Sequence, residues 1–108
     1  MTEFYRQHTK KIVLKEIKSL SETTKLYPVK ISFRKTKRRW GSCNYKNEIN
    51  FTVTLAQLPL ECIRYIILHE LTHIKYKNHG KEFYNFIKRH MPDYKELEKR
   101  IKIYSPMV

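Results

Sequence analysis

Residues 59–76, PLECIRYIILHELTHIKY, decide the fold. Proline suits the first turn of a helix, so Pro59 marks the start, and Glu61 lies where a negative charge favours the positive end of the helix dipole. A strongly apolar run follows, and Asn78 and Gly80 end it. The stretch predicts one largely buried helix from Pro59 to Tyr76, around which a small domain is built.

The same helix carries a metal-binding pattern in its second half. His69 and His73 are four residues apart and lie on one face, where both ring nitrogens can reach a zinc ion at about 2.0 to 2.1 Å. Glu70 is rotated by about 100° from His69, beside the ion but outside its ligand shell. Zinc lowers the pKa of bound water towards about 7, and an adjacent carboxylate can accept the proton. The pattern predicts a catalytic zinc site that hydrolyses peptide bonds, with Glu70 as general base.

Two residues compete for the place of the third zinc ligand. His79 follows the expected helix end, where the chain can turn back under the ion, and Glu82 is a carboxylate slightly further on. We favour His79 and keep Glu82 as the alternative. A closed structural zinc site needs four ligands, and no fourth Cys or His is near in the sequence. An unpaired carboxylate at Glu70 would also be costly on so apolar a helix unless it has a function.

Composition and charge are those of one small domain. We expect residues 1–108 to form a single core, and the 41% of hydrophobic residues is ordinary for a globular protein. The formal net charge of +13 favours polyanions or acidic substrates. Cys43 and Cys62 form no Cys-x-x-Cys pair, so we expect a reducing setting. We identify no signal region or membrane-length apolar segment, and therefore expect a cytoplasmic protein that does not bind membranes.

Periodicity along the rest of the chain predicts an α+β fold. Helical spacing recurs at the N-terminus and after the metal-binding pattern, and alternation between them predicts strands. We expect a three-stranded meander, in which the strands pair in sequence order. The expected elements are a helix at 4–20, a polar break at 19–24, strands at 29–33, 38–43 and 49–53, the helix at 59–76, and two helices at 83–91 and 93–104.

Five short motifs carry a resemblance to a known family. They are RWGSC at 39–43, LP at 58–59, HELTH at 69–73, NHG at 78–80 and MPDY at 91–94. In their order and spacing they resemble the YgjP-like zinc metallopeptidases, relatives of the WLM and SprT-like peptidases. The chain is also similar to selecase and other minimal single-domain metallopeptidases. The resemblance covers roughly Val29 to Lys102.

The resemblance implies a minimal zincin-like fold that binds zinc and cleaves polypeptides. The strand at 39–43 would be the upper edge strand of the cleft, where a free edge can pair with an extended peptide backbone. Gly41 would let that backbone approach closely. The implied zinc ligands are His69, His73 and His79, with Glu70 as the base, and the implied substrate-binding residues are Trp40, Gly41 and Ser42.

Three further expectations concern the surface. Basic residues crowd the segment 35–40, KTKRRW, and SprT-like relatives act on DNA-bound proteins. The alternative function is therefore a basic nucleic-acid-binding module with a structural or degenerate zinc site. Arg39, Tyr76 and Tyr84 are candidate stabilisers of a tetrahedral oxyanion. So small a core also leaves apolar surface, and we expect self-association into homo-oligomers.

Overall fold

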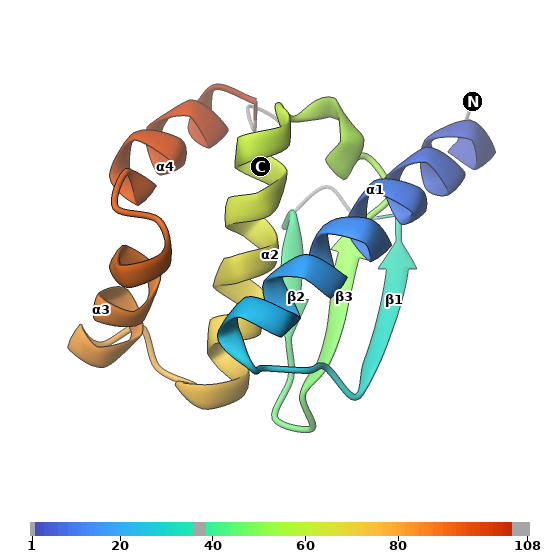
Figure 1. Ribbon diagram of the computed structural model, residues 1–108. Coiled ribbons are helices and arrows are strands. Elements are labelled where there is room, and N and C mark those ends of the chain that lie inside the picture. The colour runs from blue at the N-terminus through green and yellow to red at the C-terminus, as the bar shows by residue number, and fades with distance from the viewer. Residues whose placement is uncertain (1, 36–38, 105–108) are drawn as a thin grey trace.

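The computed structural model describes residues 2–35 and 39–104 and confirms the expected α+β class (Figure 1). The chain begins with a long helix, forms a small sheet and continues through further helices. None of the described helices is both long enough and apolar enough to span a lipid bilayer. In chain order the elements are α1 (Thr2–Thr24), β1 (Lys30–Arg34), β2 (Gly41–Cys43), β3 (Glu48–Thr52), the 3-10 helix η1 (Leu55–Gln57), α2 (Leu60–Lys75), α3 (Lys81–His90) and α4 (Tyr94–Ile103).

The strand order of the sheet is β1-β3-β2, so the expected meander is wrong. β1 runs parallel to β3, and β2 pairs antiparallel with the other side of β3. Burial explains this order, because β3 contributes the buried Ile49 and Phe51, whereas the Gly-Ser-Cys sequence of β2 has little apolar surface. The most apolar strand therefore takes the centre. β2 is also shorter than the expected 38–43, and residues 36–38 lie outside the described part of the chain.

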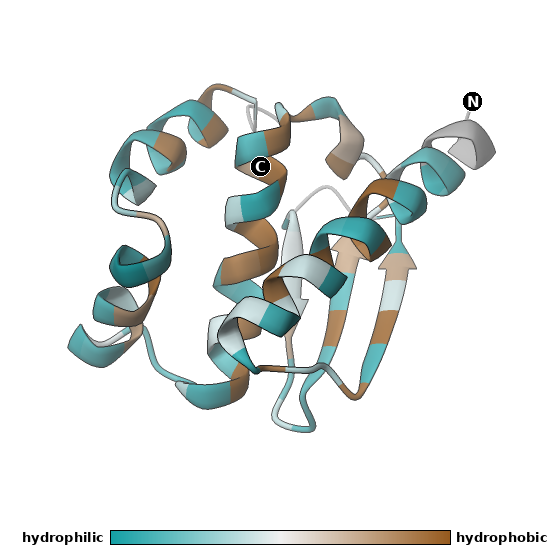
Figure 2. Cartoon of the chain, in the orientation of Figure 1, coloured by the Kyte–Doolittle hydropathy of each residue, from teal (hydrophilic) through white to brown (hydrophobic). Residues whose placement is uncertain are grey.

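The pairing of β1 with β3 separates an apolar from a polar face of the sheet. Ile31 and Phe33 of β1 lie opposite Ile49 and Phe51 of β3. Because successive side chains of a strand alternate, all four point to one face, which α1 crosses in Figure 1. Figure 2 shows the resulting hydrophobic and hydrophilic bands along both strands. The helices thus cover the apolar face, and the residues of the other face are polar.

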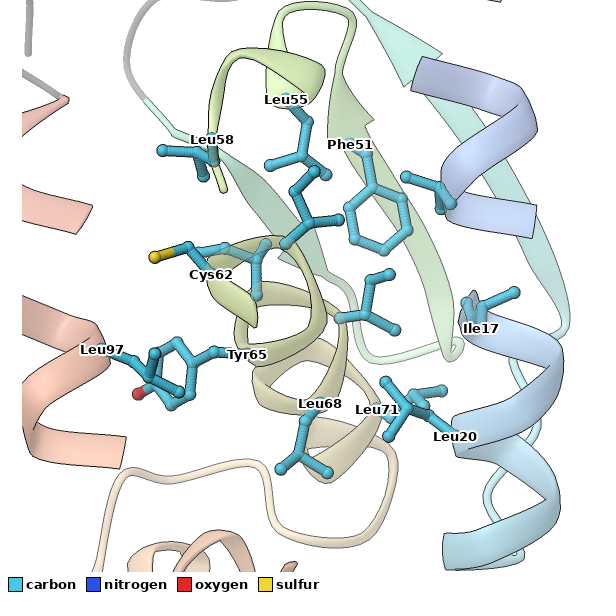
Figure 3. Packing of buried hydrophobic residues seen from close by; sticks show 14 of the residues in the cluster. Ile17, Leu20, Phe51, Leu55, Leu58, Cys62, Tyr65, Leu68, Leu71 and Leu97 are labelled. Carbon is cyan, nitrogen blue, oxygen red and sulfur yellow. The ribbon is translucent and has the colours of Figure 1, made fainter. Parts of the chain in front are cut away.

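α2 is the centre of the core. It spans Leu60–Lys75 and is preceded by Pro59, as the sequence predicted to within a residue. Nine of its side chains are buried. Figure 3 shows Leu71 facing Leu20 of α1, and Tyr65 facing Leu97 of α4. A helix held on both sides in this way gives the residues it carries fixed positions.

α1 continues through the segment 19–24, where we expected a break. The hydroxyl groups of Thr23 and Thr24 donate to the carbonyls of Ser19 and Leu20, four residues earlier. These polar side chains therefore bond within the helix instead of ending it. Lys25, with a φ of 63°, follows the last helical residue.

Candidate metal centre and active-site cleft

The end of α2 and the segment after it bring three histidine rings together. His69 and His73 lie one turn apart on α2, which ends at Lys75, and the following residues turn His79 back towards them. Nε2 of His79 lies 3.0 Å from Nε2 of His73 and 3.2 Å from Nε2 of His69. Two nitrogens bound tetrahedrally to zinc at about 2.0 to 2.1 Å are about 3.3 Å apart. The spacing therefore fits one shared ion.

The structure separates the two candidates for the third ligand. Among residues 2–35 and 39–104, the group that could hold a metal ion consists of His69, His73 and His79. Glu82 is exposed in the first turn of α3 and is not part of that group. The geometry therefore favours His79 over Glu82.

Two contacts hold the rings in place. Nδ1 of His73 donates to the backbone carbonyl of Tyr76 at 3.1 Å, which leaves Nε2 free as a ligand atom. The buried Phe83 ring packs against all three imidazoles, with centroid distances of 5.0, 4.7 and 4.9 Å. Sequence reasoning used Phe83 only to locate a helix, and its position four residues after His79 was the available signal for this role.

Burial keeps two of the imidazoles neutral. Together with the neighbouring His73 and His79 rings, burial lowers the pKa of His69 to about 4. Burial also lowers the pKa of His73, although the hydrogen bond to Tyr76 acts in the opposite direction. Neutral imidazole is the form that binds a metal ion. At neutral pH, His69 and His73 therefore need not lose a proton before they bind a metal ion.

Glu70 lies beside the histidines in the wall of the same cleft and is only 6% exposed. Burial raises the pKa of its carboxyl group to about 7, and the positive charge of Arg39 opposes part of this rise. A carboxyl group that titrates near neutral pH can both accept and return a proton. The site can therefore supply a base beside three metal-ligand nitrogens.

Gly41 of β2 leaves the space that Glu70 occupies. A Cβ atom at Gly41 would lie 3.2 Å from Glu70 Cγ, 3.2 Å from Phe51 Cδ1 and 3.2 Å from the backbone oxygen of Asn50. These distances are tighter than ordinary van der Waals contact. We expected glycine here to allow the approach of a substrate backbone, and the structure adds a second reason, the close approach of the carboxylate side chain.

The cleft between β2 and α2 consists of two adjoining hollows that share Gly41 and Glu70 in their lining. The larger, of about 560 Å³, contains the three histidines and Ser42. The smaller, of about 320 Å³, extends towards α4 and is lined by Trp40. All three expected substrate-binding residues, Trp40, Gly41 and Ser42, therefore line the cleft.

Arg39 is the candidate oxyanion stabiliser that the structure places in the larger hollow. The Tyr76 ring instead packs against Phe86 with a centroid distance of 6.0 Å. Tyr84 stacks on Tyr94 at 5.9 Å. Neither tyrosine lines the larger hollow, so its geometry favours Arg39 alone.

Lys77 lines the cleft, although nothing in its spacing singled it out among so many basic residues. Its Nζ donates to the carbonyl of Asn44 and to Oδ1 of Asn47, and so ties the β2–β3 turn to the segment that follows α2. A second unpredicted contact lies in the smaller hollow, where the Tyr65 hydroxyl donates to Glu98 at 2.6 Å. Both contacts join segments far apart in the sequence, which periodicity does not reveal.

Both the sequence and the fold of the chain match those of known proteins. A family model described as "YgjP-like, metallopeptidase domain" matches residues 1–104. The fold is similar to the metallopeptidase zymogen jannalysin of Methanocaldococcus jannaschii, with a TM-score of 0.73 and 23% identity over 89% of this chain and 97% of that one. It is also similar to the zymogen abylysin of Pyrococcus abyssi, with a TM-score of 0.67 and 27% identity over 96% of this chain and 94% of that one.

A curated relative matches a shorter part of the chain. The protein named UTP pyrophosphatase from Escherichia coli (strain K12) is 36% identical over 58 residues. The match covers 54% of this chain and 35% of that protein. The chain therefore spans about a third of the length of this relative.

Proposed function

The chain belongs to the YgjP-like metallopeptidase family, and from this premise we propose that it is a zinc-dependent endopeptidase. Membership of a metallopeptidase family implies a metal cofactor. In our proposal His69, His73 and His79 hold the ion, and Glu70 is the general base. The observation that carries the proposal is the convergence of three imidazole Nε2 atoms beside Glu70 in one cleft.

The donor set supports zinc as the metal. Three neutral imidazoles are the ligands of known catalytic zinc sites, which keep a fourth position open. When bound, zinc would acidify a water molecule and polarise the scissile carbonyl.

Glu70 would move the proton in this reaction. Its carboxylate would take a proton from the attacking water and return it to the nitrogen of the leaving amine. Arg39 lines the same hollow, so its guanidinium is available to the negative charge that develops on the carbonyl oxygen.

The free edge of β2 supports an extended polypeptide as substrate. The Asn44 amide donates to the carbonyl of Glu48, and the Thr52 amide donates to the carbonyl of Trp40. Hydrogen-bonded and non-hydrogen-bonded pairs alternate along an antiparallel ladder, so the backbone groups of Gly41 and Cys43 point away from β3. We infer that a substrate backbone pairs with these groups and that Ser42 contributes its side chain only.

The proposal is tested by measuring bound zinc and the cleavage of an unstructured polypeptide in the same preparations. Glu70→Gln should keep zinc and lose about 100-fold or more in cleavage rate, because only the proton acceptor is removed. His79→Ala should lose both zinc and cleavage. Glu82→Ala, at an exposed position in the first turn of α3, is the control and should keep both. Cleavage by Glu70→Gln at the wild-type rate would show that the assignment of the base is wrong.

Hydrolysis of a nucleoside triphosphate is a second candidate function. The Escherichia coli relative is named UTP pyrophosphatase, and in this chain Arg39 and Lys77 line the hollow that contains the histidines. Such cations can bind phosphate groups. Release of pyrophosphate from UTP, lost in Glu70→Gln and unaccompanied by peptide cleavage, would favour this function. Salt-sensitive DNA binding without hydrolysis of either substrate would favour the nucleic-acid-binding alternative.

A further inference from the structure

We propose that the polar face of the sheet carries a subsite for acidic side chains of the substrate, so that the enzyme selects acidic polypeptides. This inference rests on the proposed peptidase function and names its substrate class. The subsite is a hollow of about 310 Å³ at the end of the sheet.

The register of the strands builds this hollow. Arg34 of β1 is paired with Thr52 of β3, and Ser42 of β2 is paired with Asn50 of β3. By the alternation of side chains, these four residues share the face opposite Phe51. They line the hollow together with Lys35, Arg39, Gly41 and Phe51.

The lining of the hollow is suited to an anion. The described residues of the lining include the cations Arg34, Lys35 and Arg39 and no carboxylate. Among the side chains described, those of residues 6–35 and 39–104, the ion pairs involve none of these three cations. Ser42 and Asn50 add a hydroxyl and an amide that can donate hydrogen bonds. Guanidinium groups bind carboxylates and phosphates in a bidentate manner, so the hollow matches either.

The hollow adjoins the active-site cleft through β2. Arg39, Gly41 and Ser42 line both. A peptide paired with the free edge of β2 continues the pleat of the sheet, so its side chains point alternately towards Glu70 and towards the face that carries Ser42. Every second side chain of the substrate therefore lies on the side of the basic hollow.

The hollow favours carboxylates of a polypeptide over a nucleotide or a single-stranded nucleic acid. Nucleotides and single-stranded nucleic acids are usually held by aromatic rings on which their bases stack. Phe51 is the aromatic residue in the described lining, and it is only 1% exposed. The described part of the lining thus offers charge and hydrogen-bond donors, and its aromatic ring is too buried for a base to stack on.

Two peptides of equal length test the proposal, one neutral and one with Glu at every second position. Fluorescence anisotropy measures the binding of each peptide to the Glu70→Gln protein, in which cleavage does not interfere. We expect the acidic peptide to bind about fivefold more tightly. The added substitutions Arg34→Gln and Lys35→Gln should bring the two dissociation constants together. The control pair Lys10→Gln and Lys18→Gln removes the same charge from exposed positions of α1 and should preserve the preference.

The outcomes distinguish this inference from the proposed function. The subsite would be refuted if the Glu70→Gln protein bound the two peptides equally well. It would also be refuted if the control substitutions at Lys10 and Lys18 reduced the preference for the acidic peptide as much as those at Arg34 and Lys35. Both results are independent of what the wild-type enzyme cleaves. Inorganic pyrophosphate serves as a third probe. If the Arg34 and Lys35 substitutions abolish its binding but leave the peptide preference unchanged, the hollow serves phosphate groups and the proposal is wrong. Absence of cleavage by wild type would refute the peptidase function but not the peptide-binding result.

Discussion

Replacing Glu70 by Gln should stabilise the metal-free protein at alkaline pH and change its stability little in acid. The carboxyl group is 6% exposed, and burial raises its pKa from the ordinary value of 4.5 to about 7. Below the pKa of the unfolded chain, Glu70 is protonated in both states and costs nothing. As the pH rises to about 7, the unfolded chain loses this proton while the folded protein retains it, so the free energy of unfolding decreases.

The size of the effect follows from the two pKa values. Each pKa unit corresponds to about 1.4 kcal/mol, so the change from 4.5 to about 7 lowers the stability of the wild type by about 3 kcal/mol. The loss is complete once the pH exceeds the pKa in the folded protein. Gln has nearly the same shape and does not titrate. The stability difference between Glu70→Gln and wild type should therefore grow by about 3 kcal/mol between about pH 4 and about pH 8.5.

Urea unfolding of both proteins in the presence of a chelator measures this difference. All other ionisable groups are common to the two proteins, so their effects cancel to first order when the two free energies are subtracted. Glu82→Gln, at an exposed position of α3, is the matched control and should show no comparable growth with pH. If the difference between Glu70→Gln and wild type is the same at both pH values, the inferred cost of burying the Glu70 carboxylate is wrong.

Four further predictions concern neighbouring features. Gly41→Ala should lower the free energy of unfolding by about 1 to 3 kcal/mol in urea and should reduce the turnover rate, because the added Cβ would press on Glu70. Thr9→Val should cost about 1 to 3 kcal/mol in thermal unfolding, because the buried hydroxyl bonds two backbone groups after β3, which Thr9→Ser would preserve. Lys77→Met should raise KM with little loss of stability, because the substitution removes the hydrogen bond that holds the turn containing Asn47 against the cleft. If homo-oligomers bury the free edge of β2, activity per molecule should fall with concentration, and constant activity across dilutions would exclude that interface.

Patterns within single segments predicted most of the helices and the positions of the three strands, but not the order of the strands in the sheet. The buried helix at 59–76 combined a proline start, a long apolar run and an end marked by Asn78 and Gly80, all local signals, and α2 differs from it by one residue at each end. The order of the strands depends on a comparison of all three. β3 lies between β1 and β2, and its side chains Ile49 and Phe51 are buried. The alternation of residues within one strand does not show which strand is central.

The arrangement of the candidate site could be predicted to the extent that its residues lie on one helix. The i, i+4 spacing placed His69 and His73 on one face without knowledge of the fold. The choice between His79 and Glu82 depended on how the chain turns after α2, which spacing left open. Phe83, which packs against the three rings, joins a different element to the site, and only the tertiary structure shows this.

The position of Glu70 on the central helix explains how a buried carboxylate is kept where the chemistry needs it. α2 is held between the sheet and α1 on one side and α4 on the other, so the helix fixes the backbone of Glu70 at the wall of the cleft. In metal-free protein at neutral pH, the cleft therefore contains a neutral His69 imidazole beside a carboxyl group whose pKa is about 7. A divalent cation held by the histidines would favour the ionised carboxylate, so metal binding and proton release by Glu70 should be linked. The burial that raises this pKa in the metal-free protein thus makes metal binding depend on pH near neutrality.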